Sequence, residues 1–583
     1  MTRGMTQGTG SRRSRRRSWV AGLMVLSVIV AAGCGGDDDD DSGAGGDTAG
    51  SAAGGDATSG TDVATTGTAG STGSTGEVDT TPLVIARNMD LTSLDPHRAV
   101  CDTCQFVFTS LYQTLVGLDT DNKTLIPNLA ESWEINDDNT VYTFHLAPEA
   151  TFSDGSSVEA KDVEFSLLRL KNLKVSLTYL VDDIQTIDTP DDKTVVVTLG
   201  VPNAEFLNNM NAAYPVIVNS DVAIENGATD ADDADTTDTA EAWFIQNSAG
   251  SGPYVLESFS QGDEITMTAN PSYWRDPAPI ATVTVKQAET AAAQAQMLQT
   301  GEADIAMQID PITAKTLEGV DSVTVETIPS FNFLYIGLWP GITSGTNHPL
   351  DDNVRKAIRM AIDYQGLTDT LLDGKGQQQP SPIPNGFPGS AGLKMPATDV
   401  EGAKQLLEEA GATDLTFTLG YPTINAYGVD YSQLAQIIQQ DLAKIGVTIE
   451  LDPQTFSVNV DQFRTSQLSA NLLYWAPDYY GSAQYVSYFG LVEGSRASKN
   501  AGGGEDTPLI DPVTQEAYDA ARASGSAEKR EEQYGIAGQQ MLDQNMVIPL
   551  LSPDLVLAYQ SNIDGVTYSA CCNLVVDQIH RTD

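Results

Sequence analysis

The chain has 583 residues and a formal charge of −48, with 31 Lys and Arg residues against 79 Asp and Glu residues. So acidic a chain lacks the basic surface that nucleic-acid binding requires, which excludes that class of function. It is also longer than a single hydrophobic core supports, so we expect at least two lobes.

The N-terminus carries the features of an export signal. Six arginines precede an apolar run at residues 19–32, which is too short to span the roughly 30 Å of a bilayer core as a helix. The run ends in Ala31-Ala32-Gly33-Cys34, which resembles the lipid-attachment box of bacterial lipoproteins. We therefore expect residues 1–33 to be a signal peptide and Cys34 to carry the lipid. A plain secretory signal with an incidental Cys is the alternative, and the paired arginines also permit twin-arginine export.

The next segment, residues 34–81, is mostly Gly, Ala, Ser, Thr and Asp, with an unbroken acidic run at residues 37–41. Such a composition has almost nothing to bury and predicts a disordered tether, with an r.m.s. reach of roughly 35–40 Å. A tether of this kind suits a domain held above a membrane. Weak cation binding by the aspartates is the less favoured interpretation.

Strand-like and amphipathic helical segments alternate beyond the tether, which indicates an α/β class. We expect strands at residues 83–87, 140–146, 447–451 and 546–551. We expect helices at residues 158–170, 354–362, 399–411, 431–445 and 527–544.

Three of these helices begin at recognisable capping residues. Ser157 is placed to cap the first, and either Asp351 or Asp352 to cap the second. Thr398, followed three residues later by Glu401, forms the capping-box pattern before the third.

Four cysteines remain besides Cys34, and an even number in an exported protein favours disulfides. Cys101, Cys104, Cys571 and Cys572 allow three pairings, and we expect either local bridges or bridges that join the two ends of the chain. Cys101-x-x-Cys104 could instead be half of a zinc or redox site. No second Cys-x-x-Cys and no suitably spaced His accompanies it in the sequence, so we expect neither a metal nor a cofactor.

Several phrases of the sequence together resemble one family. Residues 125–170 contain Pro-Asn-Leu-Ala-Glu-Ser-Trp, then Phe-Ser-Asp-Gly, then Glu-Ala-Lys-Asp-Val-Glu-Phe. This stretch resembles the peptide-type substrate-binding proteins of ABC importers, solute-binding family 5. Further phrases of that family stand at residues 94–97 (Leu-Asp-Pro-His), 250–254 (Gly-Ser-Gly-Pro-Tyr), 270–274 (Asn-Pro-Ser-Tyr-Trp), 298–305 and 354–358.

The resemblance implies a two-lobed fold like that of periplasmic binding proteins, with an extra subdomain and a ligand cleft between lobes joined by a hinge. Lobe I would comprise residues 82–122, 247–334 and 548–583, the subdomain residues 123–246, and lobe II residues 335–547.

The resemblance also points to a ligand anchor. The Trp475-x-x-Asp478 spacing matches the place where peptide-binding members of the family put a carboxylate against the α-ammonium group of the peptide. A buried amine needs such a charged partner, because unpaired desolvation costs it several kcal/mol. A loop aspartate after a buried tryptophan is the alternative. The loop at residues 421–429, where dipeptide binders carry an Arg for the ligand carboxylate, has neither Arg nor Lys, which disfavours a dedicated dipeptide clamp.

Four aromatic residues complete the candidate ligand-binding set, and buried core is the alternative for about half of the aromatic pool around them. They are Tyr479, Tyr480, Phe331 and Phe333.

The function implied by the resemblance is a lipid-anchored, monomeric receptor on the outer face of the bacterial cytoplasmic membrane. It would capture peptides, oligopeptides rather than dipeptides, and deliver them to ABC permease and ATPase subunits without covalent chemistry. The same role with an oligosaccharide or another non-peptide solute is the alternative. Two other classes are an adhesive surface lipoprotein and an exported hydrolase. The sequence has no Gly-x-Ser-x-Gly or His-Glu-x-x-His motif for a hydrolase.

Overall fold

The computed structural model describes residues 78–91, 93–570 and 573–582. The predicted signal peptide, Cys34 and most of the predicted tether lie outside the described residues, as do Cys571 and Cys572. Within the described ranges, no helix combines the length and apolar character needed to cross a membrane. The same ranges hold no group of three or more His, Cys, Asp or Glu side chains placed to bind a metal ion.

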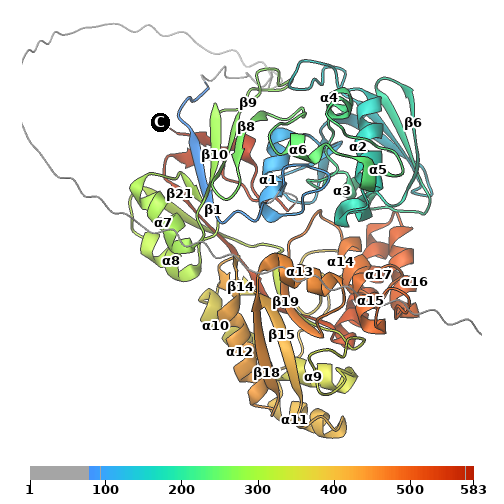
Figure 1. Cartoon of the computed structure of the whole chain (residues 1–583), viewed down its shortest axis with the longest axis vertical. Helices are drawn as coiled ribbons and strands as arrows, with labels where there is room; N and C mark the ends of the chain where they lie inside the picture. The colour runs from blue at the N-terminus through green and yellow to red at the C-terminus, as the bar shows by residue number, and fades with distance from the viewer. Residues whose placement is uncertain (1–77, 92, 571–572, 583) are drawn as a thin grey trace, which may run out of the picture. The chain divides into compact units, whose positions relative to one another are not determined.

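A seven-stranded sheet draws its strands from both ends of the described chain (Figure 1). In spatial order these are β12 (Val323–Ile328), β21 (Leu555–Gln560), β11 (Ile305–Ala306), β1 (Leu83–Arg87), β10 (Thr282–Gln287), β9 (Glu264–Ala269) and β8 (Tyr254–Ser260). The strand β1 confirms the prediction for residues 83–87 and runs parallel to both of its neighbours. The same region contains α1 (Asp102–Leu111), α7 (Ala291–Thr300), α8 (Pro311–Leu317), β22 (Ile563–Asp564), η2 (Val576–Gln578) and β23 (His580–Arg581).

A four-stranded antiparallel sheet occupies the segment at residues 123–246. Its order is β4 (Ala130–Ile135), β5 (Val141–Leu146), β7 (Thr194–Leu199) and β6 (Ile184–Asp191). Strand β5 alternates between buried and partly exposed residues, with Tyr142, Phe144 and Leu146 inside, as its period-two pattern predicts. The surrounding elements are β2 (Val116–Leu118), β3 (Leu125–Pro127), α2 (Ala160–Asn172), η1 (Ser176–Leu180), α3 (Phe206–Asn209), α4 (Ser220–Glu225), α5 (Ala234–Thr237) and α6 (Glu241–Phe244).

A six-stranded sheet lies in the remaining part of the chain. Its order is β14 (Gly376–Gln377), β20 (Val547–Pro553), β13 (Phe333–Leu338), β19 (Ala470–Trp475), β15 (Thr416–Pro422) and β18 (Thr448–Gln454). Its helices and its small hairpin are α9 (Asp352–Ala361), α10 (Tyr364–Leu372), α11 (Val400–Glu409), β16 (Asn425–Ala426), β17 (Val429–Asp430), α12 (Tyr431–Ala443), α13 (Phe456–Arg464), α14 (Ala483–Phe489), α15 (Arg496–Gly502), α16 (Pro512–Arg522) and α17 (Ala527–Gln544). The α/β class expected from the sequence is confirmed.

The chain passes between the six- and seven-stranded sheets at two short connections. One is residues 329–332, between β12 and β13, and the other is Asp554, between β20 and β21. Because β20 pairs with β13 in the six-stranded sheet, the last passage falls six residues after the predicted boundary at residue 548. These two neighbouring connections are where a hinge between the sheets would bend.

Two of the three predicted helix caps are wrong by one or two residues. Helix α2 has Glu159 as its N-cap, while Ser157 accepts a hydrogen bond from Lys193 at 3.0 Å. Helix α11 is capped by Asp399, whose carboxylate accepts the Gly402 N–H at 2.9 Å.

The remaining cap prediction is confirmed for Asp351, which accepts the Val354 N–H at 3.0 Å at the start of α9. Thr398, the residue predicted for α11, instead donates its hydroxyl to the Ile362 carbonyl at 2.7 Å. In both α2 and α11 the N-cap is an acidic residue that lies one or two positions further along the chain than the predicted cap.

A disulfide joins Cys101 to Cys104 at the start of α1. Cys101 is also the N-cap of that helix, since its sulfur accepts the Cys104 N–H at 3.0 Å. Next to it, the Asp102 carboxylate pairs with Arg87 at 2.9 Å and accepts the Asn573 amide at 2.6 Å. The beginning and the end of the described chain are therefore fastened together at α1.

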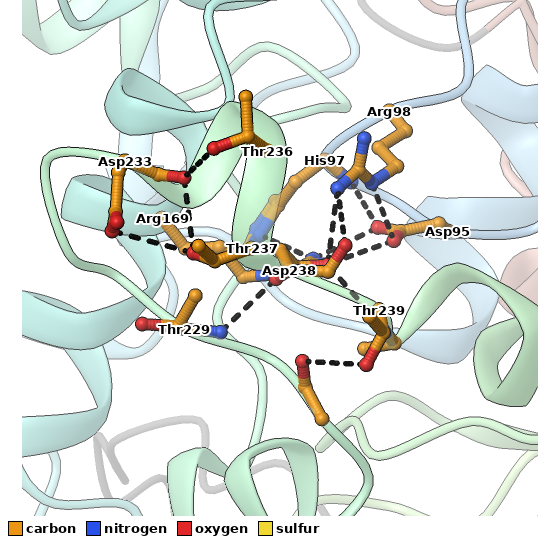
Figure 2. A network of polar contacts seen from close by, with 12 residues as sticks. Asp95, His97, Arg98, Arg169, Thr229, Asp233, Thr236, Thr237, Asp238 and Thr239 are labelled. Atoms are coloured by element: carbon orange, nitrogen blue, oxygen red, sulfur yellow. Dashed lines mark hydrogen bonds and ion pairs between the residues drawn. The ribbon is translucent and has the colours of Figure 1, made fainter.

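A buried ionic network fastens the 123–246 segment to the first part of the chain (Figure 2). Arg169 on α2 donates to both oxygens of Asp95, at 2.8 and 2.6 Å, and to both oxygens of Asp238, at 2.8 and 3.1 Å. All three side chains are fully buried. His97 lies beside them, with Nδ1 3.2 Å from Arg169 and Nε2 3.0 Å from the Val216 carbonyl.

Candidate functional site

A cavity of about 570 Å³ lies between residues 176–209 and residues 464–522. This volume falls in the range of sites that enclose small ligands. The resemblance implied a cleft between lobes I and II. The cavity instead has one wall from the predicted subdomain and the opposite wall from predicted lobe II, and Val100 is the lining residue from predicted lobe I.

Asp478 lies in this cavity, in the loop after β19. The hydroxyl of Tyr179, on η1 in the opposite wall, donates to the Asp478 carboxylate. The backbone N–H of Asp478 donates to Gln484 Oε1 at 2.9 Å. Burial raises the pKa of Asp478 to about 6, and the Tyr179 hydrogen bond opposes that shift only in part. The cavity therefore holds a carboxylate whose hydrogen-bond partner is a hydroxyl and whose ionised form a cation would stabilise.

Trp475, the last residue of β19, forms an aromatic wall beside Asp478. Its ring lies 4.5 Å from the Tyr488 ring and 5.1 Å from the Phe489 ring, centroid to centroid. Trp475 and Tyr488 are both half-buried and line the cavity. Such partly exposed rings offer a flat apolar surface to a ligand.

Gln484 holds the loop that carries Asp478 in place. Its side chain is 1% exposed, and its Nε2 donates to the carbonyls of Tyr479 at 2.6 Å and Gly481 at 3.0 Å. Because its Oε1 also accepts the Asp478 N–H, one amide ties together both ends of the loop. Gln484 thus positions the carboxylate.

The other predicted site residues are divided between the cavity and the core. Tyr479 lines the cavity but is 2% exposed. Tyr480 and Phe331 form a separate aromatic group with Phe387, at centroid distances of 4.8 and 5.0 Å. Phe333 is fully buried in the six-stranded sheet, as the first residue of β13, all of whose residues are buried. The structure therefore brings Asp478, Trp475 and Tyr479 together and places the other three elsewhere.

Three arginines that the sequence did not single out also line the cavity. Arg496 pairs with Glu505 at 3.2 Å, and Arg522 pairs with Asp183. Arg464, at the end of α13, donates to the hydroxyl of Ser176 in the opposite wall at 3.4 Å, and this contact is exposed. Because its contact there is a neutral hydroxyl, Arg464 can receive an anionic group.

Residues 124–496 match the model of the bacterial extracellular solute-binding proteins, family 5 middle. The probable D,D-dipeptide-binding periplasmic protein DdpA of Escherichia coli K12 is 28% identical over 413 residues, which cover 70% of this chain and 77% of that protein. The glutathione-binding protein GsiB of Pectobacterium atrosepticum is 30% identical over 378 residues, which cover 63% and 68%.

The fold is also that of a solved structure. The periplasmic binding protein DppA of Helicobacter pylori, in complex with the peptide STSA, superposes with a TM-score of 0.75 and 21% identity. The match covers 87% of this chain and 99% of that one. The expected two-lobed binding-protein fold is thereby confirmed.

Proposed function

The chain belongs to the bacterial extracellular solute-binding proteins of family 5, and from this membership we propose that it captures peptides for an ABC importer. The names of its relatives, which bind D,D-dipeptides and glutathione, support a peptide-type solute. The observation that carries the proposal is Asp478, a carboxylate with a raised pKa that faces a cavity of ligand size.

Capture rests on charge pairing at the two ends of the solute. The α-ammonium group of a peptide replaces water with the Asp478 carboxylate, which offsets the several kcal/mol that desolvation of a free amine costs. Trp475 and Tyr488 pack against the first residues, and Arg464 receives the carboxylate or a backbone carbonyl. The loop at residues 421–429 carries no cation, so we propose peptides longer than dipeptides.

Delivery rests on closure and anchoring. The six- and seven-stranded sheets are the cores of two lobes that move about residues 329–332 and Asp554. The solute favours the closed state by its greater affinity for it, and the protein performs no covalent step. Lipidated Cys34 would hold the receptor at the outer membrane face, next to the permease.

The proposal is tested by a thermal-shift screen of the purified protein with tri- and tetrapeptides, the same peptides N-acetylated, and oligosaccharides. Free peptides are expected to raise the melting temperature and the acetylated ones to lose most of that effect. Asp478→Asn is expected to abolish the difference, while Asp369→Asn, on the exposed face of α10, keeps it. Stabilisation by acetylated and free peptides alike would refute the ammonium anchor, and stabilisation by oligosaccharides alone would refute the peptide class.

A further inference from the structure

The wall of the cavity that faces Asp478 is joined to the opposite wall by polar contacts, which include the Tyr179–Asp478 and Asn208–Tyr480 hydrogen bonds. We propose that the Asp183–Arg522 ion pair and its flanking hydrogen bonds form a latch by which the segment at residues 123–246 closes over the solute. This rests on the proposed function, and the latch itself is defined in the solute-free protein. The latch comprises Asp183, Ala204 and Glu205 on one side, with Ala483 and Arg522 on the other.

Arg522 is the centre of the latch. It ends α16, and its guanidinium pairs with Asp183, at the start of β6, while lying 5.3 Å over the Tyr518 ring. Its side chain is 14% exposed and that of Asp183 is 19% exposed, so solvent screens the pair only in part. Asn203 also donates to the Asp183 carboxylate, at 2.9 Å.

Two hydrogen bonds to the end of α16 add to this pair. The Arg522 carbonyl accepts the Ala204 N–H at 2.7 Å, and the Ala523 carbonyl accepts the Asn139 side-chain amide at 3.3 Å. The last carbonyls of a helix lack intrahelical partners, so they are free to accept from the opposite wall. The Arg522 side chain and the helix end that carries it therefore attach the 123–246 segment to α16.

A second point of contact lies at Glu205. Its carboxylate is 4% exposed and accepts the Ala483 N–H at 3.1 Å. A Cβ added at Gly481 would come within 2.6 Å of the same carboxylate and 2.5 Å of the Tyr479 ring. A methyl group at this position would therefore displace the Glu205 carboxylate from the Ala483 N–H.

The contact is polar, as expected of surfaces that separate. The hydrophobic core of the 123–246 segment is continuous with that of the seven-stranded sheet. Among the described residues, Tyr479 is the one buried residue from the 335–547 segment in that core. An interface with so little shared apolar surface opens at lower cost than a divided core does.

Latch and cavity are parts of the same surface. Asp183, Asn203, Tyr518 and Arg522 all line the cavity that contains Asp478. Separation of the latch therefore opens the cavity wall, and closure of the latch encloses whatever lies inside. A more highly populated closed state raises the apparent affinity for an enclosed solute, up to the intrinsic affinity of that state.

The latch is tested by amide hydrogen exchange of the full-length, solute-free protein, followed by mass spectrometry. The amides of Ala204 and Ala483 exchange only when the walls part. Arg522→Gln, Asp183→Asn and Gly481→Ala are each expected to speed their exchange about tenfold, which corresponds to the loss of one charge-assisted hydrogen bond. Lys404→Gln, which removes an exposed ion pair within α11, is the matched control and is expected to change nothing.

Two further measurements distinguish opening of the latch from destabilisation of the whole fold and from the effect of a bound solute. Amides of α9 should stay protected in every variant, and the exchanged pair D183R/R522D should restore protection. Unchanged exchange at Ala204 and Ala483 in all three variants would overturn the latch. A pool of tri- and tetrapeptides is then added to the wild type. If the peptides gave no protection, that result would count against the proposed function only, because the latch is decided by the comparison without solute.

Discussion

At the scale of single residues, the site is defined by an acid whose partner is a hydroxyl. Asp478 accepts from Tyr179 across the cavity, and burial is the larger influence on its pKa. In a chain that already carries a charge of −48, a buried carboxylate is held at a cost unless something neutralises it. In the proposed function a solute ammonium group provides that neutralisation, and Asp478 is the residue that recognises it.

The raised pKa makes solute capture depend on pH. Asp478 is ionised above its pKa of about 6, and the peptide α-ammonium stays protonated throughout the range below about 7.7. Affinity for a tetrapeptide should therefore be highest near neutral pH and fall about tenfold for each pH unit below 6. Isothermal titration at pH 7, 6 and 5 measures this.

Asp478→Asn is the control for that pH dependence. It should bind weakly with no pH dependence between 5 and 7. A wild-type affinity that stayed constant over the same range would show that Asp478 is not the group that meets the ammonium.

The sequence predicted the local part of this site and missed its distant part. Trp475 and Asp478 stand three residues apart, in a phrase that a family resemblance can mark. Tyr179 lies 299 residues from Asp478, and Arg464 comes from another helix, with no pattern to distinguish it from a surface arginine. Phe333 stands in an aromatic-rich stretch for which a ligand contact and a buried core are both predicted alternatives, and it lies in β13, which is buried on both faces.

At the scale of elements, the phrase at residues 250–254 gains a physical explanation. Its glycines pack closely against the end of α1. A Cβ at Gly252 would lie 2.5 Å from the Ser110 carbonyl oxygen, and its N–H donates to the Leu111 carbonyl at 3.1 Å. This packing fixes β8 against α1.

Gly252→Ala should therefore destabilise the fold by about 3 kcal/mol, because the added methyl group meets backbone that cannot move aside. Gly535→Ala on α17 is the matched control, since its nearest neighbour would lie at 3.8 Å. Removing a glycine from a helix should be neutral or stabilise by roughly 0.5–1 kcal/mol. Urea unfolding of both variants checks the pair, and equal losses would refute the packing argument.

The ionic network in Figure 2 joins two of the phrases that marked the family. Asp95 and His97 come from the Leu-Asp-Pro-His phrase, and Arg169 lies near the end of the stretch at residues 125–170. The Val216 carbonyl can only accept, so His97 is neutral, with its proton on Nε2 and with Nδ1 accepting from Arg169. Burial, and then the Arg169 charge, lower the pKa of His97 to about 4.

This histidine should make the protein sensitive to mild acid. Unfolded, His97 takes up a proton near pH 6.5, while the folded protein resists it down to about pH 4. The stability it contributes is complete above pH 6.5 and falls by about 3 kcal/mol as the pH drops to 4. Urea unfolding of the wild type and His97→Gln at pH 7, 5.5 and 4.5 tests this, and the variant should show the flatter profile. If the unfolding free energies of the two proteins changed in parallel with pH, a group other than His97 would be responsible for the acid sensitivity.

Elements were predictable where a local signal marks them, and their order in the sheets was not. The helix at residues 527–544 and the strand at residues 83–87 appear with the predicted bounds. The insertion of β21 between β11 and β12 joins strands about 230 residues apart, and no periodicity encodes such pairing. The cap predictions failed where an acidic residue further along the chain, and not Ser157 or Thr398, is the N-cap.

At the scale of the whole molecule, the net negative charge opposes folding, whereas the Asp183–Arg522 ion pair favours closure of the cavity. With 79 acidic against 31 basic residues, compaction brings like charges together, and screening should relieve that repulsion. Raising ionic strength from about 0.01 M to 1 M shortens the Debye length from about 30 Å to about 3 Å. The melting temperature should therefore rise with NaCl, as calorimetry can show, and a fall or no change would mean that the acidic surface does not oppose folding.

The same salt should act in the opposite direction on the contact that closes the cavity. The Asp183–Arg522 pair is partly exposed, so screening weakens it while the molecule as a whole becomes more stable. Hydrogen exchange at Ala204 in NaCl should then accelerate even as the melting temperature climbs. Arg522→Gln should lose this salt response, because it has no ion pair left to screen. If exchange at Ala204 slowed in step with global stability, the contact between residues 123–246 and 335–547 would open only by unfolding, and the Asp183–Arg522 pair would not act as a latch.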